Sequence, residues 1–150
     1  MNFSPYEASD RAHSTADHKA VRLFFKKNGR WHHESITLVW HKNNTPHNLK
    51  LLINQWLTTA TDEHIIPPNI TLESIALGTP GSDLFISFDH TLFKKDDSIM
   101  HKWSVVEGLI KTIYAAINTI HALTLQVHHQ PILDDHLELA QAIPIQEFCS

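Results

Sequence analysis

The sequence predicts an α+β domain in which two helices pack on one face of a mixed or antiparallel sheet. Apolar residues recur at helical spacing in two long segments, which predicts amphipathic helices. In five shorter segments apolar and polar residues alternate, as in strands that have one buried face and one solvent-exposed face. The helical segments are residues 45–60 and 99–120, and the strand segments are residues 20–25, 36–40, 71–77, 84–88 and 123–127. The predicted order is therefore β-β-α-β-β-α-β, with a short final strand around Leu137 and Leu139.

The first two strands are predicted to form a hairpin. In "AVRLFFKKNGRW", Val21, Leu23 and Phe25 alternate with polar positions, and Asn28-Gly29 is a strong turn dipeptide. The next segment, "ESITLVW", places Ile36, Leu38 and Trp40 on one face and is interpreted as a second strand or a short extended segment.

The first helix is expected to begin in "NNTPHNLK", with Thr45 as N-cap and Pro46 as the first helical residue. It ends before "IIPPN", because each proline removes a donor and biases its predecessor to extended geometry.

The segments "TLESIAL" and "DLFISFD" are predicted strands joined by the loop "GTPGS". Alternation places Thr71 and Glu73 on the same face as Ile75 and Leu77. Asp97 or Ser98 is expected to cap the second helix, whose apolar repeat runs from Ile99 to Ile120. Within that helix Gly108 indicates a tight helix–sheet contact, since glycine costs a helix about 1 kcal/mol relative to alanine.

Length and composition suit one domain, expected over residues 19–147, after a flexible lead or linker (1–18) and before a tail (148–150). The net charge of -4 and the pI near 6.3 argue against nucleic-acid binding. The one cysteine, Cys149, cannot form an internal disulfide. No apolar stretch is long enough to span a membrane, and no secretory segment follows Met1. The chain is cytoplasmic if it is complete; the polar lead instead suggests a longer native chain with an amino-terminal anchor.

Thirteen histidines raise the question of a metal site. Two adjacent pairs, His32-His33 and His128-His129, are expected on strands, where neighbours point to opposite faces. Neither pair would then form a one-sided clamp. Solvated histidines are the favoured interpretation, and a metal-ligand set is the alternative.

The remaining chemistry is sparse. The carboxylate pairs Asp96-Asp97 and Asp134-Asp135 are expected in loops, where solvation and capping explain them better than acid/base work. Four glycines are too few for a phosphate-binding loop, and no G-x-S-x-G segment occurs. The sequence therefore predicts no catalytic residue, no cofactor and no metal. Trp31, beside the turn, is the best candidate for an exposed contact.

The order of segments resembles a GerMN domain, the module found in bacterial sporulation and germination proteins and in some cell-wall amidases. The resemblance covers roughly residues 20–146. It is carried by "VRLFF", "LKLLINQWLTTATDEHIIPPNITLESIAL", "DLFISFDHTLF", "SVVEGLIKTIYAAINTIHALTLQVHHQP" and "DDHLELAQAIPI". It implies an extracytoplasmic domain of the cell envelope that has no catalytic residues, is anchored by a segment outside the domain and associates side by side with other modules.

The leading hypothesis is thus a non-enzymatic envelope domain that mediates protein–protein assembly with a partner or with itself. Trp31, His33 and Pro80 are the candidate partner contacts. One alternative is a peptidoglycan or carbohydrate binder that uses Trp31 and His33. Another is a metal-binding or hydrolytic protein that uses the histidines.

Overall fold

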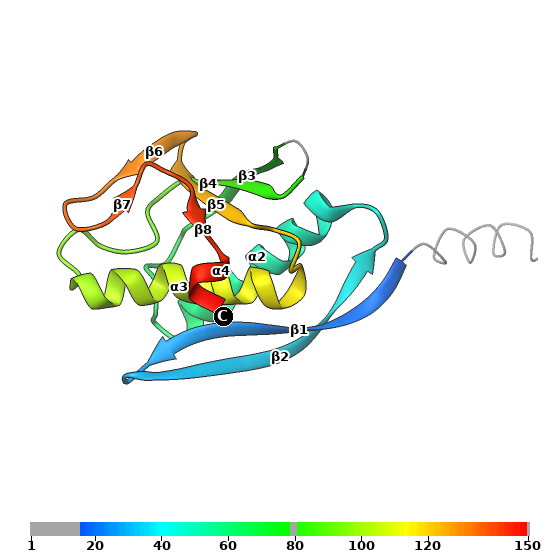
Figure 1. Ribbon diagram of the computed structural model, residues 1–150. Helices are drawn as coiled ribbons and strands as arrows, with labels where there is room; N and C mark the ends of the chain where they lie inside the picture. The colour runs from blue at the N-terminus through cyan, green and yellow to red at the C-terminus, as the bar shows by residue number, and fades with distance from the viewer. Residues whose placement is uncertain (1–15, 79–80, 150) are drawn as a thin grey trace, which may run out of the picture.

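The computed structural model describes residues 16–78 and 81–149. The described chain forms three layers: a two-stranded hairpin, a pair of helices, and a six-stranded sheet (Figure 1). The predicted class and element order are confirmed. The elements are β1 (Ala16–Lys27), β2 (Arg30–His41), α2 (Thr45–Asp62), β3 (Leu72–Leu77), β4 (Asp83–Phe88), α3 (Ile99–Ala116), β5 (Ala122–Val127), β6 (Gln130–Leu133), β7 (Glu138–Leu139), β8 (Ile143–Pro144) and α4 (Gln146–Cys149).

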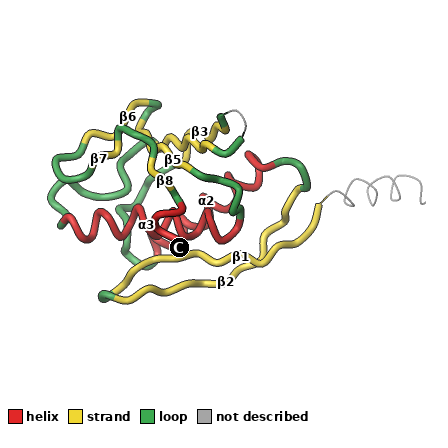
Figure 2. The backbone as a smooth tube through the Cα atoms, viewed as in Figure 1, coloured by secondary structure: helices red, strands yellow, loops and turns green. Residues whose placement is uncertain are grey.

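The two sheets lie on opposite sides of the helices (Figure 2). The larger sheet has the order β3-β4-β5-β6-β7, with β8 also paired to β5. Its one parallel pair is β4 with β5, which α3 connects, and the other pairs are antiparallel. Buried apolar side chains from both sheets and both helices form one core. None of the described helices is long and apolar enough to cross a membrane.

The β1–β2 hairpin is regular along its whole length. Its register runs without interruption from Ala16↔His41 to Lys27↔Arg30. Asn28 and Gly29 both have positive φ, at 54° and 76°, which is the turn geometry that the dipeptide predicted.

The hairpin is attached to the helices at Phe24. The Phe24 N–H donates to Thr112 Oγ1 at 2.9 Å, and Trp56 Nε1 donates to the Phe24 carbonyl oxygen at 3.0 Å. A Cβ at Gly108 would lie 2.8 Å from that same oxygen. The predicted tight contact at Gly108 is confirmed, and its partner is β1.

The helix ends differ from the prediction at one cap. Asn44 caps α2, with its Oδ1 accepting from the His47 N–H at 3.4 Å, so Thr45 as N-cap was wrong. Thr45 already has helical geometry, and the residue before it carries the side-chain acceptor. Ser98 caps α3 as predicted, by accepting from the His101 N–H at 3.1 Å.

The apolar repeat of the second helix extends further than the helix does. α3 ends at Ala116, and Ile117 already has extended geometry, so Ile120 follows the helix. Ile99, at the other end, is 52 % exposed. Periodicity identified the helix but did not fix which members of the repeat are buried.

A bulge in β3 changes the predicted face of that strand. The register passes from Leu72↔Phe88 to Ser74↔Ser87, so Glu73 is an extra residue. Leu72 therefore shares the inner face with Ile75 and Leu77, and the placement of Thr71 and Glu73 there was wrong. The β3–β4 hairpin itself is confirmed, although residues 79–80 of its loop, including the candidate contact Pro80, lie outside the described residues.

The chain ends contain more structure than the sequence predicted. β1 begins at Ala16, inside the segment predicted to be a flexible lead, and residues 1–15 lie outside the described part of the chain. After β5, the structure adds β6, β8 and the short helix α4 to the predicted final strand.

Candidate functional site

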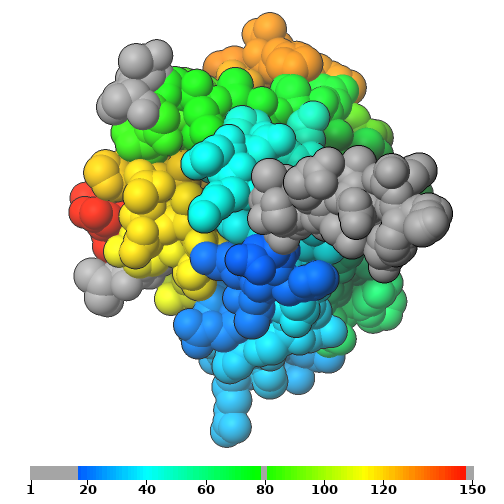
Figure 3. All heavy atoms as spheres, turned by 90° about the vertical axis from the view of Figure 1, so that its right-hand side faces the viewer, coloured from blue at the N-terminus to red at the C-terminus, as the bar shows by residue number. Residues whose placement is uncertain are grey.

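The β1–β2 hairpin differs in charge from the rest of the chain. Residues 16–41 contain five Lys or Arg and two Asp or Glu, a net charge of +3. Residues 42–150 contain six Lys or Arg and twelve Asp or Glu, a net charge of -6. The hairpin forms the lower part of the face seen in Figure 3, so its basic side chains are gathered at one side of the molecule. We call this hairpin, residues 16–41, the basic arm.

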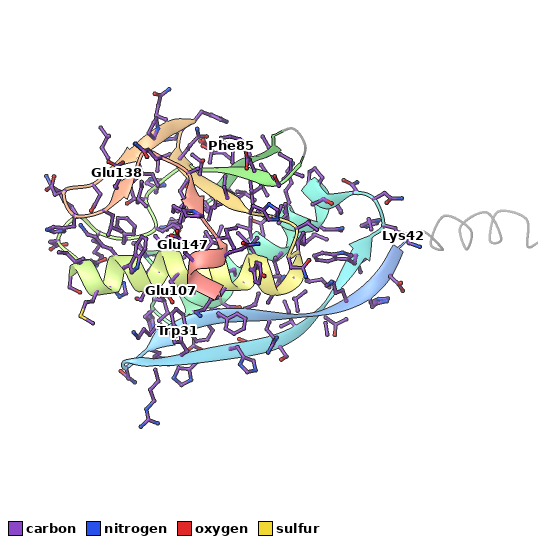
Figure 4. The ribbon with its side chains drawn as sticks, in the orientation of Figure 1. Trp31, Lys42, Phe85, Glu107, Glu138 and Glu147 are labelled. Carbon is purple, nitrogen blue, oxygen red and sulfur yellow. The ribbon has the colours of Figure 1, made fainter. Side chains whose placement is uncertain are left out.

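Trp31 lies on the basic arm but is not the open contact that the sequence suggested. It is half-buried, and two ammonium groups approach its ring: Lys26 Nζ lies 5.9 Å and Lys111 Nζ 5.1 Å from the ring centroid. Figure 4 shows Trp31 beneath α3, close to Glu107, whose Oε2 lies 3.8 Å from Lys111 Nζ. These cation–π contacts occupy the ring and link the arm to α3.

His33 is exposed, as expected of a contact residue. It packs on Phe24 with ring centroids 5.7 Å apart, whereas His32 stacks on Phe25 at 6.3 Å. The prediction that this pair points to opposite faces is confirmed. His33 and Trp31 are two residues apart on β2, so the structure places both on the outer face of the arm.

An open hollow of about 370 Å³ lies between the outer face of the arm and α3. Arg22 and Phe24 line it from β1, and Lys111 and Tyr114 line it from α3. It combines an aromatic floor with two cationic groups, a lining suited to an acidic or aromatic side chain of a partner.

The second histidine pair behaves differently from the prediction. His128 and His129 lie in the β5–β6 turn with φ of 51° and 64°, not on a strand, so their side chains need not alternate. His128 Nδ1 lies 2.8 Å from Glu73 Oε2, and His129 Nε2 lies 2.9 Å from Ser74 Oγ. The pair therefore converges on the β3 bulge, and the expected opposite orientation was wrong.

This cluster has the residue types of a Ser-His-Glu triad but not its environment. His129 Nδ1 is 3.9 Å from Glu73 Oε1, and the His129 side chain is 63 % exposed. Activation of a serine needs a water-excluded site with preorganised donors, which an exposed turn does not provide. No three His, Cys, Asp or Glu side chains within the described residues come together as a metal site. The cluster therefore fastens the turn to the sheet.

A buried ion pair is the polar feature that the sequence did not reveal. The side chain of Lys102 is 0 % exposed and that of Asp134 is 5 % exposed, and Nζ donates to Oδ1 at 2.8 Å. Lys102 Nζ also donates to the Lys95 carbonyl at 2.8 Å and lies 3.2 Å from His136 Nδ1. Asp134 lies in a loop and accepts from backbone N–H groups as expected, but the expectation that it is solvated was wrong.

Burial alone would raise the pKa of Asp134. Hydrogen bonds from Lys102 and from the N–H groups of His136 and Leu137 outweigh this effect and hold the pKa below its ordinary value. This cluster connects the start of α3 to the β6–β7 loop. Because both Lys102 and Asp134 are fully hydrogen-bonded, it leaves neither group free for chemistry. Nothing in the sequence separates Lys102 from Lys111, the other lysine of α3, so the pair could not be predicted.

Comparison with known proteins finds likeness in structure only. No protein-family model and no curated protein matches the chain. A crystal structure of a "Putative Lipoprotein from Clostridium perfringens" covers 89 % of this chain and 91 % of its own, with a TM-score of 0.52 and 14 % identity. The two chains share a fold. At this identity the likeness assigns no site residue.

A second solved structure is that of the tandem GerMN domains of the sporulation protein GerM from Bacillus subtilis. The match has a TM-score of 0.49 and 7 % identity, and it covers 87 % of this chain. The chain spans about half of that structure, 46 % of its length.

Proposed function

We propose that this chain is a non-enzymatic, GerMN-like domain of the bacterial cell envelope, and that it binds a protein partner through the basic arm. One observation carries the proposal: a regular hairpin of net charge +3, with exposed histidine and arginine side chains, stands on a body of net charge -6. Separated charge of this kind favours an oriented encounter with a partner of the opposite sign.

The envelope location has two supports. The order of sequence segments resembles GerMN domains, which are extracytoplasmic. The solved structure that shares the fold carries the name "Putative Lipoprotein", and lipoproteins are held at membranes by an attached lipid. Reading the gene upstream of Met1 tests this part, and we expect a signal or anchor segment there.

The structure offers less support for the alternatives. A carbohydrate binder would stack a sugar on an open aromatic ring, but Lys26 and Lys111 already approach the ring of Trp31. A hydrolytic protein would need a sheltered acid–base group, but the Glu73 cluster is exposed and the Lys102 cluster is fully paired.

The test is a pull-down from detergent-solubilised host envelope with this chain as bait, read by quantitative mass spectrometry. The test variant is Arg22→Glu with Lys26→Glu, which reverses charge on the arm. The matched control is Lys50→Glu with Lys94→Glu, two exposed lysines outside the arm that give the same change in net charge.

We expect wild type and control to retain the same specific protein and the arm variant to lose it. Retention by both variants would mean that the arm is not the binding surface. Retention of no protein by the wild type would contradict the assembly function. Sedimentation of the chain with purified cell wall, lost in Trp31→Ala, would instead establish the glycan binder.

A further inference from the structure

The outer edge of β2 carries main-chain groups that face away from β1. The N–H and C=O of Phe24 bond to Thr112 and Trp56 instead of to β2. In an antiparallel ladder, residues lie opposite each other in pairs. In every second pair, the N–H and C=O groups of both residues point away from the partner strand. The register partner of Phe24 is His33, so the main-chain groups of His33 face the outer edge.

The alternation of the ladder extends this assignment along β2. It predicts outward groups at Ser35, Thr37, Val39 and His41. At His41 the structure provides an independent check, because Asn48 Oδ1 accepts from the His41 N–H at 2.9 Å and Asn48 Nδ2 donates to its carbonyl at 2.8 Å. From His33 to Val39 no such cover is present among the described residues, and β1 is the only strand paired with β2 there.

This edge lacks three features that commonly block further pairing, and its charged residues, Arg30 and Glu34, are not among the four positions whose main-chain groups face outward. Natural sheets protect long edges with lysine, proline or a bulge. β2 reads "RWHHESITLVWH", without lysine or proline, and its pairing with β1 contains no bulge. All four outward residues, His33, Ser35, Thr37 and Val39, are exposed, and Val39 is an exposed apolar side chain at 45 %. In Figure 1, β2 forms the lower margin of the molecule.

We infer that the partner supplies an extended, acidic segment that adds to this edge as a third strand of the basic arm. This inference rests on the proposed function and specifies its mode of binding. The four outward residues offer four N–H and four C=O groups, so the main chain supplies the binding energy as in other strand-addition complexes.

The acidic character follows from the side chains on the outer face. Arg22 is the register partner of Ser35, whose side chain is small. An added strand would lie roughly 10 Å from β1. The Arg22 guanidinium lies 5.5 Å from the Phe24 ring centroid, and rotation of this exposed side chain would bring it within reach of a glutamate across Ser35. His33 flanks the same position. A second copy of the chain would instead bring two arms of net charge +3 together if β2 paired with β2, which disfavours self-pairing.

The probe is a fluorescein-labelled, acetylated peptide of alternating threonine and glutamate, as long as β2. Alternation places every glutamate on one face of the added strand. There are two control probes. In the first, lysine replaces every glutamate. In the second, alternate residues carry N-methyl groups, so the edge of the peptide that faces β2 has no N–H donors. Binding to the full chain is measured by fluorescence anisotropy at low ionic strength.

The protein variant is Thr37→Pro, which removes one outward N–H and places a ring in the path of the added strand. Proline is tolerated where the strand N–H faces solvent, so the β1–β2 ladder should persist. Thr37→Ala retains the N–H and is the matched control. Far-UV circular dichroism and the thermal midpoint establish that both variants fold. The N-methylated probe needs no protein variant, so it decides the question even if Thr37→Pro fails to fold.

We expect the acidic probe to bind wild type and Thr37→Ala, and to bind Thr37→Pro at least about tenfold more weakly. The N-methylated and lysine probes should show a comparable loss. Equal binding of the acidic and N-methylated probes, or no binding of either, would overturn the inference. A wild-type dimer that Thr37→Pro converts to a monomer, measured by light scattering, would also overturn it, because a second copy would then occupy the edge.

The pull-down separates this inference from the proposed function. An envelope partner that Thr37→Pro still retains would leave the assembly function standing and remove strand addition as its mode. Loss of that same partner from Thr37→Pro, but not from Thr37→Ala, would support both.

Discussion

Substitution of Gly108 by alanine should destabilise the protein, although the same change stabilises most helices. In an exposed helix interior, glycine to alanine gains about 1 kcal/mol. Here the new Cβ would lie 2.8 Å from the Phe24 carbonyl oxygen, which is backbone and cannot rotate aside. Either α3 or β1 must therefore move.

The size of the effect follows from what that movement disrupts. Overpacking of a filled contact costs about 1–3 kcal/mol. The hydrogen bonds that Phe24 makes with Thr112 and Trp56 lengthen together, at about 1 kcal/mol each if lost. After the helix-propensity gain, we expect a net loss of roughly 2 kcal/mol, or a fall of about 4–8 °C in the thermal midpoint of a chain of this size.

The assay is thermal and urea unfolding followed by circular dichroism. The control is Ala115→Gly, which makes the reverse change at an exposed position in the last turn of the same helix, where helix propensity should cost at most about 1 kcal/mol. If Gly108→Ala were as stable as wild type or more stable, the close approach of α3 to β1 would not be required, and the described attachment of the basic arm would be incorrect.

Three further predictions concern the polar clusters. Lys102→Ala should cost about 3–5 kcal/mol in urea unfolding, because it leaves the buried Asp134 carboxylate without its partner; a pairing that contributes nothing would show no change. Because the pKa of Asp134 is lowered in the folded state, the unfolded state takes up its proton first. The contribution of the Asp134 carboxylate to the free energy of unfolding is complete above the ordinary aspartate pKa of about 3.9. This contribution is lost as the pH falls through the folded-state pKa. Asp134→Asn should therefore show a flatter decline of thermal midpoint in acid, and a decline as steep as that of wild type would contradict this assignment. Finally, elemental analysis after dialysis against zinc should find less than one zinc ion per chain, whereas one ion per chain would revive the histidine-based alternative.

Local patterns were sufficient to predict most of the elements. Alternation at Val21, Leu23 and Phe25 and the helical repeat through Trp56 each reflect one buried face, which a single sequence records directly. Even the role of Gly108 could be anticipated, because glycine inside a helix needs a packing reason.

Long-range pairing could not be predicted in the same way. The sequence of the β1–β2 hairpin does not show that it forms a separate sheet on the other side of the helices. That depends on which strands pair with β4 and β5. The bulge at Glu73 shifts the pairing register of β3 by one residue. His128 and His129 form a turn where the end of a strand was predicted. Each of these small backbone changes redirected the side chains on which the site predictions depended.

The candidate contacts remain predictions. His33 is exposed, whereas a lysine from α3, far away in the sequence, lies over the ring of Trp31. The Lys102–Asp134 pair joins residues 32 apart, and each residue alone looks like an ordinary surface charge. The open edge of β2 is invisible in the sequence, since it depends on which strands do not lie beside it.

Residue-resolved hydrogen exchange of β2, with and without the retained envelope partner, tests the central claim most directly. In the free chain, the amides of Ser35 and Thr37 should exchange rapidly, while those of Ile36 and Leu38, which face β1, are protected. With the partner bound, Ser35 and Thr37 should become protected as well. If both continued to exchange rapidly while protection appeared elsewhere on the chain, the basic arm would not be the surface through which this domain assembles.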